Sequence, residues 1–252
     1  MPRVIAIIPA RTGSSRLPRK HLRSVAGKPL LGHMIERVRR ARHLDGIVVA
    51  IPESSDNDAL EALCTTYKVA CFRGSEGDVL SRMIGALEHQ GADAGVIVYG
   101  DGFLIDPAVI DLCVKTYLAD PSYDFVGNDL IHTFPSGMFV ETVSLAALKD
   151  ADRRTNDPAI REHGTFYVRQ NPQLYKQKNF EAEDPLRRPD IHLDVDTEDD
   201  LKVMTAILEH FAPRNDFSAE DILCFLDENP AIPELNRYVH RRWKRYQHPI
   251  AK

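Results

Sequence analysis

The chain has 252 residues, of which 43% are hydrophobic and 27% are charged, so it can bury one large α/β core and requires no second domain. Its net charge of −5 and isoelectric point near 6.1 argue against broad binding of nucleic acid, which depends on positive surfaces. No apolar run approaches the roughly 20 residues of a membrane helix. The first residues lack a signal-peptide pattern, so we expect a cytoplasmic protein with no membrane partner.

Strands and helices alternate through the first half of the chain. The run from Val4 to Ile8 is apolar and β-branched without alternation, as in a strand buried on both faces of a parallel sheet. Similar runs alternate with helical spacings, which predicts a mostly parallel, doubly wound α/β sheet with right-handed crossovers. The predicted strands cover residues 4–8, 47–51, 70–72 and 96–99, and the predicted helices cover residues 30–38, 56–67, 79–89 and 107–118.

The alternation loosens after about residue 122. Short apolar pieces separated by loops rich in Asn, Asp and Pro predict a smaller mixed-sheet region over about residues 122–190, which we expect to hold a second ligand and a dimer contact. These pieces are residues 125–126, 137–142 and 164–168, followed by a predicted strand at 191–195, a predicted helix at 201–211 and two helical patterns from residue 217. The last stretch, residues 236–247, is basic and aromatic, and packing against a partner or plain solvation is expected there rather than binding of RNA or membrane.

The four cysteines show no paired C-x-x-C spacing and lie in apolar contexts typical of helices or strands. Buried, reduced thiols are therefore expected rather than zinc ligands or a disulfide framework. The four are Cys64, Cys71, Cys113 and Cys224.

A basic loop follows the first predicted strand. Arg11, Arg16 and Lys20 lie in it together with Gly13 and three hydroxyl residues. The backbone N–H groups of such a loop can point at one anion, while arginine and lysine side chains bind phosphate oxygens. This composition predicts a polyphosphate site, and the alternative is a solvated basic turn.

Three aspartates follow predicted strands and could converge on a metal ion. Asp101 comes directly after the strand at 96–99, at the sheet edge where open α/β sheets bind ligands. Asp194 and Asp196 end the strand at 191–195, and their spacing puts both side chains on one face. Carboxylates in such places hold magnesium beside a triphosphate. The alternative is that Asp101 begins a turn and Asp196 caps the next helix.

The order of residues 7–30 resembles the signature of the cytidylyltransferases that activate acidic sugars, I-x-A-R-x-x-S-x-R-L-P-x-K-x-L followed by A-G-K-P. Further blocks recur in register at residues 72–80, 100–101, 161–163 and 194–201, so the resemblance spans about residues 3–211. The chain is similar to the spore-coat polysaccharide branch, which is homologous to the CMP-Kdo and CMP-sialic acid synthetases. The resemblance implies a Rossmann-like nucleotide-diphospho-sugar transferase fold, with a single domain over residues 1–212 and a helical tail over 213–252.

The resemblance also implies a reaction and the residues that perform it. An acceptor hydroxyl attacks the α-phosphorus of CTP, pyrophosphate leaves, and CMP becomes attached to an acidic sugar. Arg11, Lys20 and Asp101 are the implied catalytic residues, and Mg²⁺ is held by Asp101 and Asp196 with a contribution from Asp194. The implied nucleotide-binding residues are Ala10, Arg11, Gly13, Ser14, Arg16, Lys20, Arg73, Ser75, Asp78 and Gly100, and the implied acceptor-binding residues are Gly137, Phe139, Glu141 and His163. Relatives commonly pair, so a homodimer is expected.

Departures from the family pattern leave the acceptor open. Phe139 stands where relatives carry a carboxylate at the acceptor wall, and His163-Gly164 follows the Kdo-type pattern instead. The alternative acceptors are a phosphonate and a sugar-1-phosphate, and the alternative donor is a nucleotide other than CTP. A further alternative is a catalytically idle nucleotide-binding protein. Helix capping is an alternative role for Ser75 and Asp78. A kinase and a dinucleotide dehydrogenase are disfavoured, because neither G-x-x-x-x-G-K-[ST] nor G-x-G-x-x-G follows the first strand.

Overall fold

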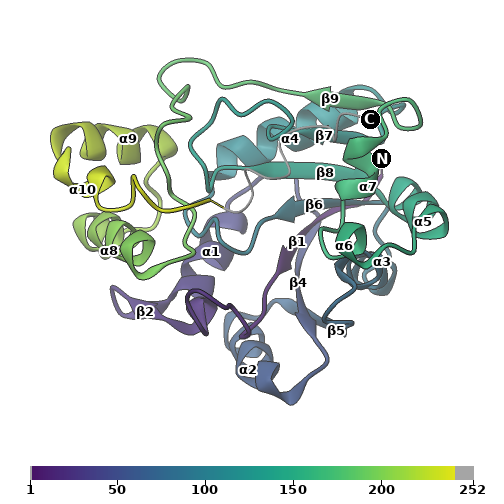
Figure 1. Cartoon of the computed structure of the whole chain (residues 1–252), viewed down its shortest axis with the longest axis horizontal. Helices are drawn as coiled ribbons and strands as arrows, with labels where there is room; N and C mark the ends of the chain where they lie inside the picture. Colours follow the sequence, from purple (N-terminus) through teal and green to yellow (C-terminus); the bar gives the residue numbers. More distant parts are fainter. Residues whose placement is uncertain (1, 242–252) are drawn as a thin grey trace.

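A seven-stranded sheet forms the centre of the computed structural model, which describes residues 2–241 (Figure 1). The strand order is β5-β4-β1-β6-β8-β7-β9, and only β8 runs against the others, so the sheet is mostly parallel as predicted. The strands are β1 (Val4–Pro9), β4 (Gly46–Pro52), β5 (Ala70–Gly74), β6 (Ala94–Val98), β7 (Phe125–Gly127), β8 (Val140–Ser144) and β9 (Gln177–Asn179). A separate two-stranded hairpin pairs β2 (Ser24–Val25) with β3 (Lys28–Pro29).

Helices cover both faces of the sheet, because each central strand is apolar on both sides. In β1, Val4, Ala6 and Ile8 join one hydrophobic core, while Ile5 and Ile7 join the other. Each of these side chains is at most 1% exposed, and full burial of an aliphatic side chain contributes about 1.5–3 kcal/mol. The first core packs against α1 (Leu30–Val38), α2 (Asp58–Tyr67), α4 (Pro107–Ala119), α8 (Glu198–Phe211) and α9 (Ala219–Glu228). The second packs against α3 (Val79–His89), α5 (Leu145–Arg154) and α7 (Phe166–Gln170). The doubly wound fold is confirmed.

Helix starts are set by polar side chains at the N-cap. Asp106 accepts a hydrogen bond from the backbone N–H of Ala108 at 2.7 Å, and Pro107 follows in the first turn of α4. Thr197 and Asp200 form a reciprocal capping box at the start of α8. One such cap stabilises a helix by about 1 kcal/mol. The other carboxylate oxygen of Asp106 accepts a bond from Ala219 N–H at 2.6 Å, which ties α9 to α4.

Two predictions in the second half of the chain are wrong. Residues 164–168, which were expected in a mixed-sheet region, lie largely in helix α7, because a short apolar piece does not distinguish a helix from a strand. Residues 191–195 form no strand. Ile191, Leu193 and Val195 are buried, and so is Asp194. The backbone pairs with loops rather than with a strand: Ser136 N–H donates to Ile191 C=O, and Val195 N–H donates to Asp101 C=O, both at 3.0 Å.

The strands of the 122–190 region extend the main sheet, since β8 pairs with β6 and β7 pairs with β8. Short helices and 3-10 turns complete the described chain: α6 (Pro158–Arg161), α10 (Ala231–Glu234), η1 (Lys20–Leu22) and η2 (Ser55–Asn57). Cys64 and Cys113 are buried and Cys71 is partly buried, but Cys224 is exposed on α9, contrary to expectation.

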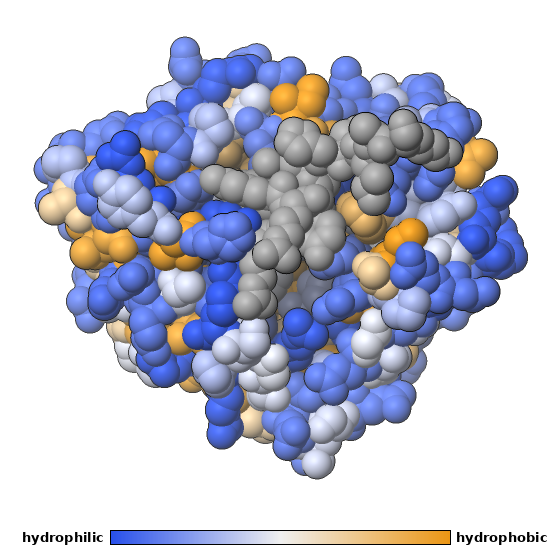
Figure 2. Space-filling model, viewed as in Figure 1, coloured by the Kyte–Doolittle hydropathy of each residue, from blue (hydrophilic) through white to orange (hydrophobic). Residues whose placement is uncertain are grey.

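The two helical patterns predicted from residue 217 are confirmed as α9 and α10. The part of the basic aromatic stretch beyond Arg241 lies outside the described residues. None of the helices between residues 2 and 241 has the length and apolar character needed to cross a lipid bilayer. On the visible part of the face in Figure 2, hydrophilic residues predominate and hydrophobic ones form small separate groups.

Candidate active site

A cavity of about 490 Å³ opens at the carboxyl ends of β1 and β6. This is the edge of an open α/β sheet at which ligands bind. Most of the sequence-predicted site residues line it: Ala10, Arg11, Ser14, Arg16, Lys20, Gly100, Asp101, Gly137, Phe139, His163, Asp194 and Asp196. The structure therefore brings the basic loop, the three aspartates and part of the predicted acceptor set into one space.

The basic loop after β1 is fixed by two buried side chains that the sequence analysis missed. Asn57 accepts hydrogen bonds at its Oδ1 from Thr12 N–H at 3.0 Å and from Thr12 Oγ1 at 3.2 Å. His21 makes a hydrogen bond from Nδ1 to the carbonyl of Arg11 at 3.1 Å. Each comes from a 3-10 turn that packs beneath the loop, so the loop holds its shape without help from a ligand.

Two glycines predicted as site residues serve the close approach of backbones. A Cβ at Gly100 would lie 2.1 Å from the carbonyl oxygen of Pro9, so only glycine lets the loops after β1 and β6 meet. Gly137 has a φ of +83°, and a Cβ there would lie 2.6 Å from the carbonyl carbon of Leu193. These contacts bring the loop that carries Asp194 to the cavity wall.

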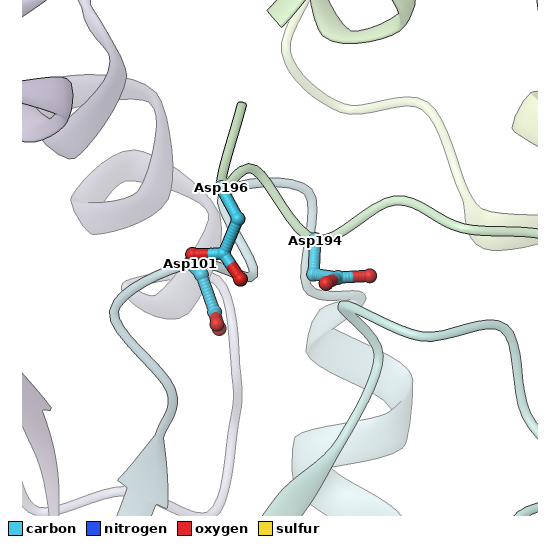
Figure 3. Close-up of side chains that lie close together, drawn as sticks. All are labelled: Asp101, Asp194 and Asp196. Carbon is cyan, nitrogen blue, oxygen red and sulfur yellow. The ribbon is translucent and has the colours of Figure 1, made fainter. Parts of the chain in front are cut away.

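Asp101, Asp194 and Asp196 each offer a carboxylate oxygen, and these oxygens all lie within 4.8 Å of one another. Figure 3 shows the three side chains gathered from two segments, Asp101 after β6 and the others from the extended chain before α8. The bond from Val195 N–H to Asp101 C=O, at 3.0 Å, locks the two segments together. Clustered carboxylate oxygens are the donors that Mg²⁺ and Mn²⁺ prefer, so the residues present fit a divalent cation.

Burial and neighbouring charges shift the pKa values of two carboxyl groups in this cluster. Burial raises the pKa of Asp101 to about 6, and the neighbouring charges of Asp196 and Asp194 add to the rise while Lys20 opposes it. Burial also disfavours the ionised form of Asp196, but Lys20 and Arg16 outweigh it and hold the pKa of that carboxyl below its usual value. A positive charge placed among these carboxylates would relieve their mutual repulsion.

Cations of the basic loop already reach the carboxylates. Lys20 is 8% exposed, and its Nζ lies 3.0 Å from Asp196 Oδ1 and 2.8 Å from the carbonyl of Val195. Arg16 pairs with the other oxygen of Asp196. The basic loop and the acidic cluster are therefore in direct contact, which is the arrangement needed to handle a polyanion and its counter-cation together.

Five predicted residues lie outside the cavity lining: Gly13, Arg73, Ser75, Asp78 and Glu141. Arg73 forms ion pairs with Asp58 and with Glu61 on α2, the latter at 2.7 Å. Ser75 accepts a bond from Asp78 N–H at 3.2 Å, and Asp78 is the N-cap of α3. The capping alternative for Asp78 is confirmed, and an ion pair of 2.6 Å with Arg161 engages it further.

Glu141 lies beneath the cavity in a charged network that the sequence analysis missed. Arg169 Nη1 lies 3.0 Å from Asp129 Oδ2 and 3.2 Å from Glu141 Oε1, and Tyr99 donates to Asp129 at 3.1 Å. Burial raises the pKa of Glu141 to about 8, with Asp129 adding to the rise and Arg169 opposing it. Thr165 donates to the second oxygen of Glu141 at 2.7 Å.

Rings form the walls above this network. The ring centroids of Phe139 and His132 are 4.4 Å apart, and those of His163 and Phe166 are 5.8 Å apart. All four side chains line the cavity, together with Arg169 and Asp129. The cavity thus combines the charged groups of the basic loop and the three aspartates with aromatic rings and a buried charged network.

The chain is similar to proteins of known class. The sequence model of a family described as cytidylyltransferase matches residues 5–225. The spore coat polysaccharide biosynthesis protein SpsF of Bacillus subtilis is 31% identical over 90% of this chain and 95% of its own length. The 3-deoxy-manno-octulosonate cytidylyltransferase of an Anaeromyxobacter species is 36% identical over 46% of this chain and 47% of its own length. The solved structure of a cytidylyltransferase from Leptospira borgpetersenii superimposes with a TM-score of 0.89 at 29% identity, over 96% of this chain and 100% of that one.

Proposed function

Because the chain belongs to the cytidylyltransferase family, we propose that it transfers CMP from CTP to a hydroxyl of an acidic sugar, a ulosonic or nonulosonic acid, and releases pyrophosphate. The observation that carries this proposal is the contact between Lys20 and Asp196 inside one cavity. It joins a phosphate-binding type of loop to a carboxylate cluster suited to a divalent cation.

The residues fit the charge changes of the reaction. The acceptor oxygen bonds to the α-phosphorus, the bond from that phosphorus to the bridging oxygen breaks, the hydroxyl gives its proton to solvent water, and pyrophosphate leaves with the negative charge. Arg11 and Lys20 bind the β- and γ-phosphates in this proposal, where fixed cations stabilise the developing charge. The backbone of the loop at Ala10 and Ser14 supplies further donors to the phosphates.

Asp101, Asp194 and Asp196 hold Mg²⁺ in this proposal. The bound ion supplies charge neutralisation for the triphosphate. The three carboxylates belong to segments that are hydrogen-bonded to each other, so their oxygens are gathered before any ligand arrives. Lys20 then exchanges its contact with Asp196 for phosphate oxygens.

The names of relatives and the residues that line the cavity support an acidic acceptor. The partial similarity is to enzymes named for 3-deoxy-manno-octulosonate, and SpsF is named for polysaccharide biosynthesis. Phe139 and His163 line the same cavity as the three aspartates, and Arg169, paired with Asp129 and Glu141, lines it too. A polar sugar with a carboxylate matches this mixture of rings and charge better than an apolar ligand does.

Pyrophosphate release tests the function. Each of the four nucleoside triphosphates is combined, in the presence of Mg²⁺, with Kdo, nonulosonic acids, sugar-1-phosphates and simple phosphonates. Release is expected only with CTP and an acidic sugar, and the Asp101→Asn variant serves as the inactive control. Release with another nucleotide or with a non-sugar acceptor would replace the proposal, and folded protein that binds no CTP in calorimetry would contradict it.

A further inference from the structure

The segment of residues 236–241, the last described part of the chain, reaches the carboxylate cluster. Arg241 is 1% exposed, and its guanidinium lies 3.1 Å from Asp194 Oδ2 and 2.7 Å from Asp200 Oδ1. The carbonyl of His240 accepts a hydrogen bond from Arg16 at 3.0 Å. The segment therefore touches both the metal-type carboxylates and the basic loop.

Asp194 is held at both of its oxygens. Ser136 donates to Oδ1 and Arg241 donates to Oδ2. Ser136 is itself fixed, because its backbone N–H and C=O pair with Ile191 and Leu193 at 3.0 Å. A carboxylate with a donor on each oxygen has little freedom to rotate.

Arg241 pairs with a second buried carboxylate in addition to Asp194. The same guanidinium pairs with Asp200, a buried member of the capping box of α8. The other oxygen of Asp200 accepts bonds from Asp196 N–H at 3.1 Å and from Thr197 N–H at 2.9 Å, so the pair is fixed in place. Two buried carboxylates therefore share the charge of Arg241, and its guanidinium is a fixed hydrogen-bond donor to Asp194.

We propose that Arg241 is a positioning residue of the metal site, which holds Asp194 so that its carboxylate stays beside Asp101 and Asp196. Through it the C-terminal segment becomes part of the active site. The inference rests on the proposed function, since it requires these carboxylates to bind a divalent cation. Donors to ligating carboxylates orient them, and loss of such a donor typically lowers metal affinity by 10- to 100-fold.

The test measures binding of Mn²⁺, without nucleotide or acceptor, to the full-length protein by calorimetry and electron paramagnetic resonance. Arg241→Met keeps an apolar side chain of similar length but removes the donor, and its Mn²⁺ affinity is expected to fall about tenfold or more. Ser136→Ala removes the donor on the other oxygen from a different part of the fold. Its affinity is expected to fall in the same direction, which keeps the test valid if Arg241→Met does not fold.

Two control variants separate positioning from simple anchoring of the segment. Arg237→Met changes an exposed arginine of the same segment that pairs only with Glu234 among its described contacts, at 2.9 Å, apart from a ring contact with Tyr238. Asn236→Ala removes one hydrogen bond to Asp200 but leaves the bonds of Arg241 to the carboxylates of Asp194 and Asp200. Both should bind Mn²⁺ like the wild type.

The outcomes separate this inference from the proposed function. If Arg241→Met folds and binds Mn²⁺ unchanged or more tightly, or if Asn236→Ala loses as much affinity as Arg241→Met, the positioning role is wrong while the metal site stands. If Asp101→Asn and Asp194→Asn bind Mn²⁺ as the wild type does, the metal site itself is wrong, and the metal assignment of the proposed function fails with it.

Discussion

Lys20 is the residue that joins the two halves of the reaction site. Lys20 is buried, and its ammonium donates to the carboxylate of Asp196 and to the carbonyl of Val195. Lys20→Ala is expected to lower kcat/KM about 10²- to 10³-fold, the loss typical of removing one preorganised donor. Steady-state release of pyrophosphate measures this. Arg23→Ala, which changes an exposed arginine paired with Glu198, is the control, and a loss of less than fivefold in Lys20→Ala would contradict the role.

Replacement of Asp101 by Asn is expected to lower activity without lowering stability at pH 7. Its folded pKa of about 6 exceeds the ordinary value of 3.8, so its contribution to stability is full below pH 3.8 and is lost as the pH rises through 6. At pH 7 the Asp101→Asn variant should therefore unfold at the same or a higher urea concentration than the wild type. Loss of a metal ligand should lower Mg²⁺-dependent turnover more than 100-fold, since such an ion contributes several kcal/mol.

A destabilised Asp101→Asn variant would show that the carboxylate is a structural group. Wild-type turnover at saturating Mg²⁺ would exclude it as a ligand. Glu162→Gln is the control and should keep Mg²⁺-dependent turnover, because Glu162 lines the cavity but does not belong to the carboxylate cluster.

At the scale of elements, η1 supports the loop after β1 from below. Its His21 is 3% exposed, and burial lowers the pKa of the imidazole to about 3 from 6.5, with nearby Lys20 adding to the fall. The unfolded chain therefore binds one more proton than the folded chain between pH 6.5 and 3. Stability from this group is complete above pH 6.5 and is lost as the pH falls, by about 1.4 kcal/mol for each pH unit.

Urea unfolding at pH 7, 6 and 5 checks this expectation. The free energy of unfolding of the wild type should fall more steeply toward pH 5 than that of His21→Asn. His43→Asn, which changes an exposed histidine, should follow the wild type. Parallel curves for the wild type and His21→Asn would contradict the proposed proton linkage.

Elements that lie close together in the sequence were the ones that sequence reasoning predicted well. The strand of β1 and its basic loop are continuous, and Asp101 directly follows β6, so their positions depend on local order alone. Asp194 and Asp196 reach the cluster although their strand was wrongly predicted, because an extended chain also turns residues i and i+2 to one side. Arg73 was placed by motif register, but its carboxylate partners on α2 are invisible to a motif.

The missed residues depend on contacts between distant parts of the chain. Arg169 meets Asp129 across 40 positions, and Arg241 meets Asp194 across 47. A lone arginine in a polar segment gives no periodic signal, and its partners are fixed only when the sheet and the tail have packed. The wrong prediction at residues 164–168 also hid the role of Arg169. This residue lies in helix α7, and a strand there would give its side chain a different direction.

At the scale of the molecule, the homodimer expected from relatives stays a prediction. The outer strand β9 carries polar residues with a lysine at its centre, a composition that discourages edge-to-edge pairing of strands. A dimer at this edge would then form through side chains rather than by extending the sheet. Light scattering is expected to give twice 28.4 kDa at every protein concentration, and a constant monomer mass would refute the dimer.

The choice of nucleotide is a property of the whole fold, and it can be measured before the acceptor is known. CTP with Mg²⁺ would bridge the loop after β1, the end of β6 and the segment before α8, three parts that separate on unfolding. A ligand at 100 times its Kd stabilises the folded state by about 2.7 kcal/mol, which raises Tm by about 5 to 10 °C in a chain of this size.

CTP should produce this shift and ATP, GTP and UTP should not, if the cavity reads cytosine. The shift should disappear without Mg²⁺ and in Lys20→Ala, because both remove positive charge from the triphosphate site. An equal shift with all four nucleotides would mean that the loop binds triphosphate without selecting the base. Specificity would then have to arise in binding of the acceptor, and the proposed cytidylyl transfer would lose its nucleotide selectivity.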